Sequence, residues 1–68
     1  MRKAFFPGSF DPFTKGHADI VYRGLKLFDE IIIGIGTNSV KQRYFAIPEI
    51  EEAIQRAFRG NERVKIVH

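Results

Sequence analysis

The sequence predicts an α/β fold in which helices pack on a parallel sheet. Three observations point to it: short, continuously apolar runs, amphipathic segments with helical spacing, and alternation of the two along the chain. Strands without polar alternation are typical of a parallel sheet that is covered on both faces. The alternation gives the element order β-α-β-α-β, with right-handed crossovers that place helices on the sheet.

The first strand and the first helix flank a polar loop. Residues 3–6 are apolar and end at Pro7-Gly8, which suits a buried strand closed by a turn. From His17 onward the spacing of apolar residues becomes helical, and we expect an amphipathic helix that ends near Phe28. Its apolar side would carry Ile20, Val21, Leu25 and Phe28.

The rest of the chain repeats this pattern. Residues 31–37, IIIGIGT, predict the second strand, although the glycines weaken it. Segment 47–60 predicts the second helix, because Pro48 stands in its first turn and Gly60 ends it, with glutamates near the start and arginines near the end. Residues 64–67 begin a third strand. The buried stripe of the second helix would consist of Ile47, Ile50, Ile54, Ala57 and Phe58.

Composition limits the class of protein. Of the 68 residues, 44% are hydrophobic, 13% aromatic and 28% charged, which is typical of an ordinary small globular domain. The chain has no cysteine, its two histidines lie far apart, and no apolar run approaches the roughly 20 residues of a membrane span. A disulfide scaffold, a zinc-stapled domain and a membrane partner are therefore not expected, and a cytoplasmic protein is.

The net charge of +3 says little about partners. Lysines and arginines are spread along the chain beside eight acidic residues, as on an ordinary solvated surface. A phosphate-bearing small ligand is favoured over a nucleic acid, because the basic residues form no patch or stripe.

The element order is that of one half of a Rossmann-type fold, in which ligands bind at the carboxyl ends of the strands. The chain ends inside its third strand, so we expect residues 1–68 to be the N-terminal part of a single doubly wound domain in a truncated chain. Alone, such a piece would expose an apolar flank and an unpaired sheet edge. We expect it to fold poorly by itself and to be inactive.

The loop after the first strand carries the chemistry. Residues 7–17 read PGSFDPFTKGH, and a glycine turn followed by a helix start is a site for anions. The loop is not a Walker A motif, since no Gly-Lys pair has the required spacing, and the only G-x-G lies inside the second strand. Gly8 would let a ligand approach the backbone closely, and Gly16 would clear space beside His17.

This stretch resembles the signature of the nucleotidyltransferase superfamily that carries H-x-G-H or T-x-G-H. In the form GSFDPxTxGH it is similar to the bacterial phosphopantetheine adenylyltransferases. The resemblance implies transfer of AMP from ATP to 4'-phosphopantetheine, giving dephospho-CoA and pyrophosphate in coenzyme A biosynthesis. It also implies Mg²⁺ as cofactor, a homohexamer and a cytoplasmic location.

The resemblance assigns roles to individual residues. His17 is the catalytic residue, which contacts ATP and stabilises charge at the α-phosphate. The Ser9 hydroxyl contacts the phosphate of 4'-phosphopantetheine, and the main chain of Ser9 and Phe10 contacts ATP. Lys41, just past the second strand, binds the acceptor substrate. A neutral imidazole in such a place still donates one hydrogen bond.

Other residues of the loop have simpler interpretations. Thr14 is expected as the N-cap of the helix, and a contact with phosphate is left open. Asp11 is expected as a turn residue rather than a Mg²⁺ ligand, so no metal ligand is assigned. The side chains of Phe10 and Phe13 are expected to pack, and His68 receives no role.

The sequence departs from the family pattern in the second helix. Ile50 stands where family members commonly have arginine, which would affect surface or subunit contacts more than chemistry.

Two other classes of function stay open. One is another transferase of the superfamily, with nicotinamide mononucleotide, glycerol phosphate or a flavin as acceptor, although those enzymes usually have histidine where Thr14 stands. The other is an anion-binding module without catalytic activity.

Overall fold

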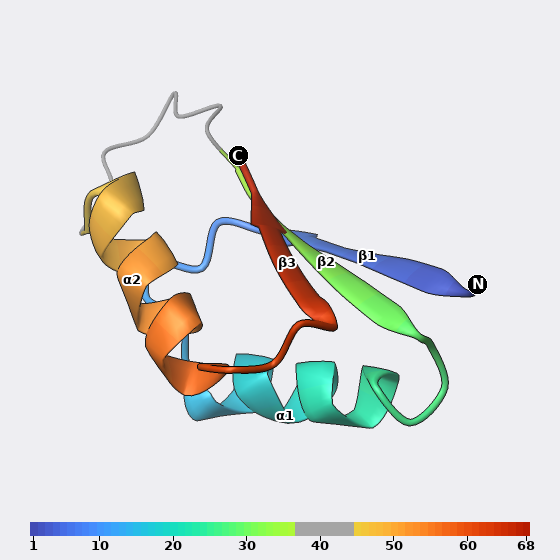
Figure 1. Ribbon diagram of the computed structural model, residues 1–68. Coiled ribbons are helices and arrows are strands. Elements are labelled where there is room, and N and C mark those ends of the chain that lie inside the picture. Colours follow the sequence, from blue (N-terminus) through green and yellow to red (C-terminus); the bar gives the residue numbers. More distant parts are fainter. Residues whose placement is uncertain (37–44) are drawn as a thin grey trace.

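The predicted element order is confirmed. The computed structural model describes residues 1–36 and 45–68, and Figure 1 shows a sheet with helices beside it. No helix in these two ranges has the length and apolar character needed to cross a membrane. The elements are β1 (Lys3–Gly8), α1 (Lys15–Gly24), β2 (Glu30–Ile35), α2 (Ile47–Ala57) and β3 (Val64–Val67).

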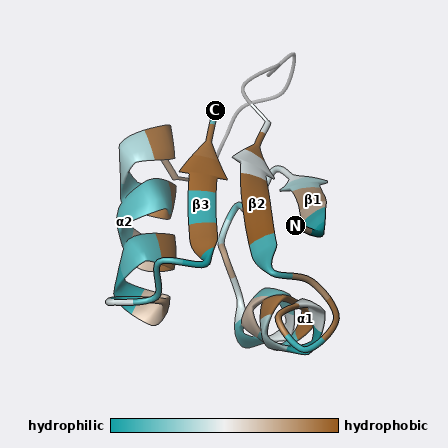
Figure 2. Ribbon diagram, turned by 45° about the vertical axis from the view of Figure 1, so that its right-hand side comes forward, coloured by the Kyte–Doolittle hydropathy of each residue, from teal (hydrophilic) through white to brown (hydrophobic). Residues whose placement is uncertain are grey.

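The strands form a parallel sheet in the order β1-β2-β3. Both helices lie on the same face of this sheet (Figures 1 and 2), because successive crossovers of one hand in one direction stay on one side. The other face is open among the described residues: Phe5 is 61% exposed and Val67 is 47% exposed. The residues of β2 itself are buried or half-buried, Ile32 among the half-buried ones, so the expectation that the second strand is covered on both faces is met in part.

The core lies between the sheet and the two helices. Alternate residues of β2 point toward the helices, and Figure 2 shows the hydrophobic side of α2 turned to the sheet. Ile33 and Ile54, from β2 and α2, are completely buried. Ile47 is only half-buried and Ala57 is exposed, so Ala57 does not belong to the stripe predicted for this helix. The buried residues are Phe10, Val21, Ile31, Ile33, Ile35, Ile50, Ile54 and Phe58.

β1 is longer than predicted. It continues through Pro7 and Gly8 instead of stopping at Phe6, and both residues are in register with β2. Proline is tolerated there because β1 is an edge strand of the described sheet, so one side of it needs no ladder hydrogen bond. The expected apolar flank is also present, since Ile20 on α1 is 52% exposed.

α1 is shorter than predicted. It ends at Gly24 rather than near Phe28, and a turn follows it. A Cβ atom at Gly24 would lie 2.8 Å from Cδ1 of Ile31, so the helix packs closely on β2 at its last residue. Leu25 and Phe28 still pack against the core, which is why their spacing continued the helical pattern in the sequence.

Arg63, which directly precedes β3, binds the segment that connects the end of α1 to β2. Its guanidinium donates hydrogen bonds to the carbonyl oxygens of Leu25 (2.5 Å), Phe28 (2.8 Å) and Asp29 (3.0 Å). Carbonyl groups that follow a helix have no partner within it and need donors from elsewhere. One side chain at the start of β3 therefore holds the connection from α1 to β2.

The remaining boundaries are close to expectation. β2 ends at Ile35 rather than at residue 37, and α2 ends at Ala57 rather than at residue 60. Gly60 has φ +80°, the left-handed conformation that glycine adopts readily after a helix. β3 was predicted over 64–67 and has those bounds.

Candidate functional site

The predicted loop begins at the carboxyl edge of the sheet. β1 ends at Gly8, and its carbonyl oxygen accepts a hydrogen bond from the N–H of Gly36 at 2.8 Å, which ties together the ends of β1 and β2. The loop then leads to α1, whose N-terminus follows this edge. Ligands of open α/β sheets bind at the carboxyl ends of strands, so the motif stands where a ligand is expected.

Thr14 and His17 cap the start of α1 reciprocally. Thr14 is the N-cap, and its side-chain oxygen accepts from the N–H of His17 at 3.4 Å. In return, the N–H of Thr14 donates to Nδ1 of His17 at 2.9 Å. The expected capping role of Thr14 is confirmed, and histidine here takes the place that glutamate has in the usual capping box.

Phenylalanine rings surround the imidazole of His17. The ring centroids of Phe10 and Phe13 lie 5.1 Å and 5.4 Å from it, the first edge-on at 87° and the second tilted by 30°. Phe6 stands farther off, at 6.3 Å. The packing role expected for Phe10 and Phe13 is confirmed. Their contact with His17 was not predicted, because sequence spacing does not tell which rings meet in space.

The missing side chain of Gly8 makes room for the ring of Phe10. A Cβ atom there would lie 2.9 Å from Cζ of Phe10, so only glycine leaves room for the ring. Phe10 itself has φ 50°, in the left-handed region that bulky residues rarely adopt, and its side chain is 3% exposed. The packing of Phe10, rather than the approach of a ligand, is the requirement for glycine that this geometry identifies.

The first turn of α1 is electropositive. It contains no acidic residue, and Lys15 opens it. Within the described ranges, the main-chain N–H groups of Lys15 and Gly16 make no hydrogen bond. Among residues 1–36 and 45–68, a Cβ atom at Gly16 would meet only Oγ1 of Thr14 outside its own helix backbone, at 3.6 Å, so these residues leave space over this turn. Unpaired amides, a helix dipole and a cation favour an anion here. Lys15 was not among the predicted site residues, although a cation at a helix start was a usable signal in the sequence.

Asp11 connects the loop to α2. Its Oδ1 accepts from the N–H of Phe45, just before that helix, at 2.8 Å. Its expected role in bonding the backbone is confirmed, although the partner is distant in sequence rather than in the same turn. Within residues 1–36 and 45–68, no group of three or more His, Cys, Asp or Glu side chains could hold a metal ion.

Four further residues named from the sequence lie outside the cap and the group of aromatic rings. Ser9 lies exposed at the start of the loop, and its phosphate contact stays a prediction. Lys41 lies outside the described residues. His68, which received no role, has Nε2 at 3.3 Å from Oε1 of Glu51. Ile50 is 2% exposed, so the departure from the family pattern falls on a core position rather than on the surface.

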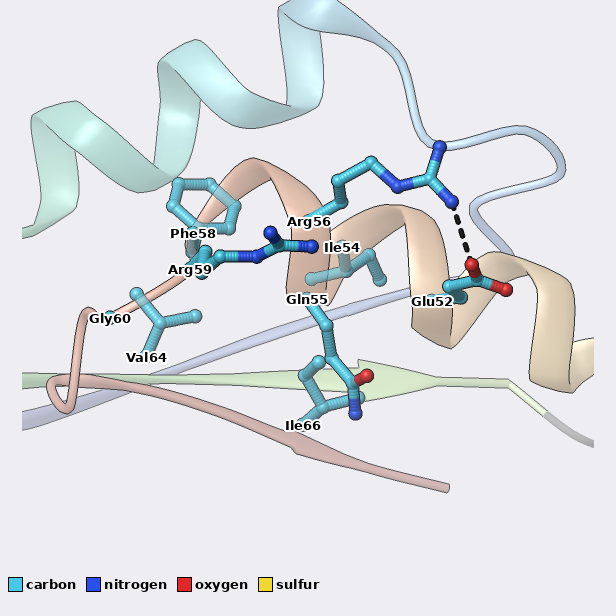
Figure 3. A pocket seen from close by; sticks show the side chains of 9 residues that line it. All are labelled: Glu52, Ile54, Gln55, Arg56, Phe58, Arg59, Gly60, Val64 and Ile66. Carbon is cyan, nitrogen blue, oxygen red and sulfur yellow. Dashed lines mark hydrogen bonds and ion pairs between the residues drawn. The ribbon is translucent and has the colours of Figure 1, made fainter.

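Two of the hollows among the described residues differ in their relation to the loop. One, of about 460 Å³, is at the carboxyl ends of the strands on the open face and includes Gly8 and Gly36 in its lining. The other, of about 390 Å³, lies between α2 and β3 (Figure 3). Its charged residues include Glu52 and Arg56, which pair with each other at 2.6 Å, and it contains no residue of the motif. The second hollow is not the predicted site.

Comparison with known proteins agrees with the motif. The cytidylyltransferase-like family model matches residues 5–66. A phosphopantetheine adenylyltransferase of Bacteroides thetaiotaomicron is 54% identical over 67 residues, which cover 98% of this chain and 44% of that protein. Proteins of the same name from Cytophaga hutchinsonii and Geobacter metallireducens are 56% and 49% identical over 63 residues each, covering 42% and 39% of their lengths. The chain thus spans less than half the length of these relatives.

Proposed function

Because the chain belongs to the cytidylyltransferase-like family, we propose that it transfers AMP from ATP to 4'-phosphopantetheine, giving dephospho-CoA and pyrophosphate in coenzyme A biosynthesis. The names of its relatives support this choice of acceptor. The single observation that carries the proposal is the start of α1. There His17 belongs to the same turn as two main-chain amides that make no hydrogen bond among the described residues, and this turn has no acidic residue.

The chemistry is an in-line displacement. A phosphate oxygen of the acceptor attacks the α-phosphorus of ATP, and the bond to pyrophosphate breaks. No covalent bond to the protein forms, so the chain contributes by placing two anions that repel each other and by stabilising charge at phosphorus. Nε2 of His17 would donate to an α-phosphate oxygen, while the amides of Lys15 and Gly16 and the ammonium group of Lys15 would attract the phosphates.

Several finer points belong to the same proposal. Ser9 and Lys41 would bind the acceptor, the main chain of Ser9 and Phe10 would contact ATP, and Thr14 would serve first as the cap. Mg²⁺ would be held largely by the phosphate oxygens of ATP, because Mg²⁺ usually keeps few protein ligands and Asp11 already bonds to Phe45. A homohexamer in the cytoplasm is the assembly and location that the resemblance implies.

The test is pyrophosphate release by the complete gene product. We expect release from ATP with 4'-phosphopantetheine and not with nicotinamide mononucleotide, glycerol phosphate or flavin mononucleotide. His17→Ala should lower turnover by about 10²-fold or more, as loss of a donor to a developing oxyanion does. Arg23→Ala, on the same helix but in an exposed ion pair with Asp19, is the control and should leave turnover unchanged.

The alternatives give different outcomes. Turnover with another acceptor would replace the proposed substrate and retain the reaction class. Absence of turnover with every acceptor, together with binding of ATP, would favour the non-catalytic module.

A further inference from the structure

We propose that Thr14 is a positioning residue that holds His17 in one tautomer, with the proton on Nε2 and the lone pair on Nδ1. The tautomer follows from contacts within the chain. Its use in catalysis rests on the function proposed above. The capping interaction that starts α1 thus also sets the hydrogen-bonding state of the catalytic ring.

The first step depends on the main-chain amide of Thr14. It donates to Nδ1 of His17 at 2.9 Å, and an amide N–H can only donate. Nδ1 must therefore carry a lone pair. In a neutral imidazole the proton then resides on Nε2.

The second step concerns the hydroxyl group of Thr14. Its Oγ1 lies 3.0 Å from Nδ1 and also accepts from the N–H of His17 at 3.4 Å. Since the oxygen accepts from the helix amide, its own proton is available to donate to Nδ1. Two donors from one residue then favour the lone pair on Nδ1, and the hydroxyl ties this preference to the helix cap.

The third step concerns the orientation of the ring. The ring of Phe10 lies nearly perpendicular to the imidazole, the ring of Phe13 is tilted by 30° to it, and Phe6 stands farther off at 6.3 Å. Rotation of the ring by half a turn would replace the Nδ1 acceptor by a C–H group opposite the Thr14 amide. The Thr14 amide therefore selects this orientation, and the aromatic rings enclose the imidazole in it.

The consequence is a single donor aimed away from the cap. Among the described residues, Nε2 of His17 has no hydrogen-bond partner. In the Nε2–H tautomer this atom offers a proton to a phosphate oxygen, whereas the other tautomer would present a lone pair to the same anion. Electrostatic stabilisation at phosphorus requires the first arrangement.

The tautomer can be measured directly in the complete gene product. Two-bond ¹⁵N–¹H correlation spectra of ¹⁵N-histidine-labelled protein, taken without substrate at alkaline pH, distinguish the two tautomers. We expect the Nε2–H form for His17. A dominant Nδ1–H form would overturn the proposal.

Variants at position 14 test the link to catalysis. Thr14→Val keeps the shape and the amide but removes the hydroxyl. The amide would then be the one donor that residue 14 still offers to Nδ1, without the support of the hydroxyl at the helix cap, so the Nδ1–H population should rise. We expect kcat to fall by about 3- to 10-fold, the worth of one hydrogen bond, with little change in KM for ATP. Thr14→Ser keeps the hydroxyl and should therefore have the tautomer and the kcat of the wild-type protein. A higher KM with unchanged kcat and tautomer would instead identify Thr14 as a direct phosphate contact and overturn the positioning role.

The control is a variant that should lose about as much unfolding free energy as Thr14→Val, but at a site far from His17. Asn61 accepts from the N–H of Arg63 at 3.0 Å at the opposite end of the sheet, and Asn61→Ala should leave the tautomer and kcat unchanged. The spectra need no substrate, so they also separate two kinds of failure. If the wild-type ring is Nε2–H but no adenylyl transfer occurs, the inference about the tautomer stands and the proposed function fails.

Discussion

The two helices begin at similar places and are built in opposite ways. Each follows the carboxyl end of a strand, and each therefore presents the positive end of its dipole and unpaired amides there. At α2, Pro48 removes one of these donors and Glu49 accepts from the N–H of Ala46 at 3.3 Å. At α1, Lys15 and Gly16 occupy the corresponding turn, and it has no acid.

The residues at the start of α2 favour helix formation, whereas those at the start of α1 favour the proposed function. The start of α2 is neutralised by its own side chains, as a structural helix requires. A lysine at the start of α1 is unfavourable to the dipole, and glycine is a poor helix former. The turn is instead supported from behind by the packed rings of Phe10 and Phe13 against His17. Lys15 and Gly16 therefore favour the binding of an anion, although neither favours the formation of the helix.

Gly8→Ala should break the support behind α1 and have the largest effect. The new Cβ would lie 2.9 Å from Cζ of Phe10, so the ring must move away from His17. We expect a loss of about 2 kcal/mol of unfolding free energy from overpacking. Turnover should fall by at least about 10-fold from misplacement of the imidazole. Urea unfolding and pyrophosphate release measure the two effects.

Gly36→Ala is the matched control for stability. Among the described residues, its Cβ would meet the carbonyl group of Gly8, with the oxygen at 3.5 Å and the carbon at 4.0 Å, which are ordinary contacts. Equal losses of stability in both variants would contradict the specific role of Gly8 in packing Phe10.

Lys15→Glu should make the start of α1 resemble that of α2. Replacing a cation by an anion at a positive helix end should raise the unfolding free energy by about 0.5–1 kcal/mol. The same change should lower kcat/KM for ATP by about 10-fold, because the phosphates would meet a negative charge at close range. Opposite signs for stability and activity are the expected signature.

Lys26→Glu makes the same change of charge just beyond the other end of α1. It should leave kcat/KM unchanged. If both lysine variants lowered kcat/KM equally, net charge rather than the start of α1 would be responsible.

Glu49→Ala changes the start of α2 instead of α1 and should have the smallest effect. It removes the acceptor of the Ala46 N–H and the negative charge near the start of α2, with an expected cost of about 0.5–1 kcal/mol in thermal or urea unfolding. Turnover should not change. A large loss of turnover would mean that the start of α2 also takes part in the site.

Much of the fold could be predicted because the apolar pattern is strong and local. The predicted bounds of β3 agree with the structure, and α2 was placed from Pro48, its charges and Gly60. The end of α1 was predicted wrongly, since Leu25 and Phe28 keep packing on the core after the helix has ended. The end of β1 was also wrong, because a proline is excluded from a central strand but not from an edge.

The sequence by itself determined the order of the elements, the loop that carries the motif, and the cap at Thr14, since each depends on residues close together in the chain. Only the tertiary structure decided which rings surround the imidazole of His17. Its aromatic neighbours come from β1 and the loop, and the room for Phe10 exists because Gly8 has no side chain. Such contacts depend on the directions of side chains in space, which periodicity and spacing do not encode.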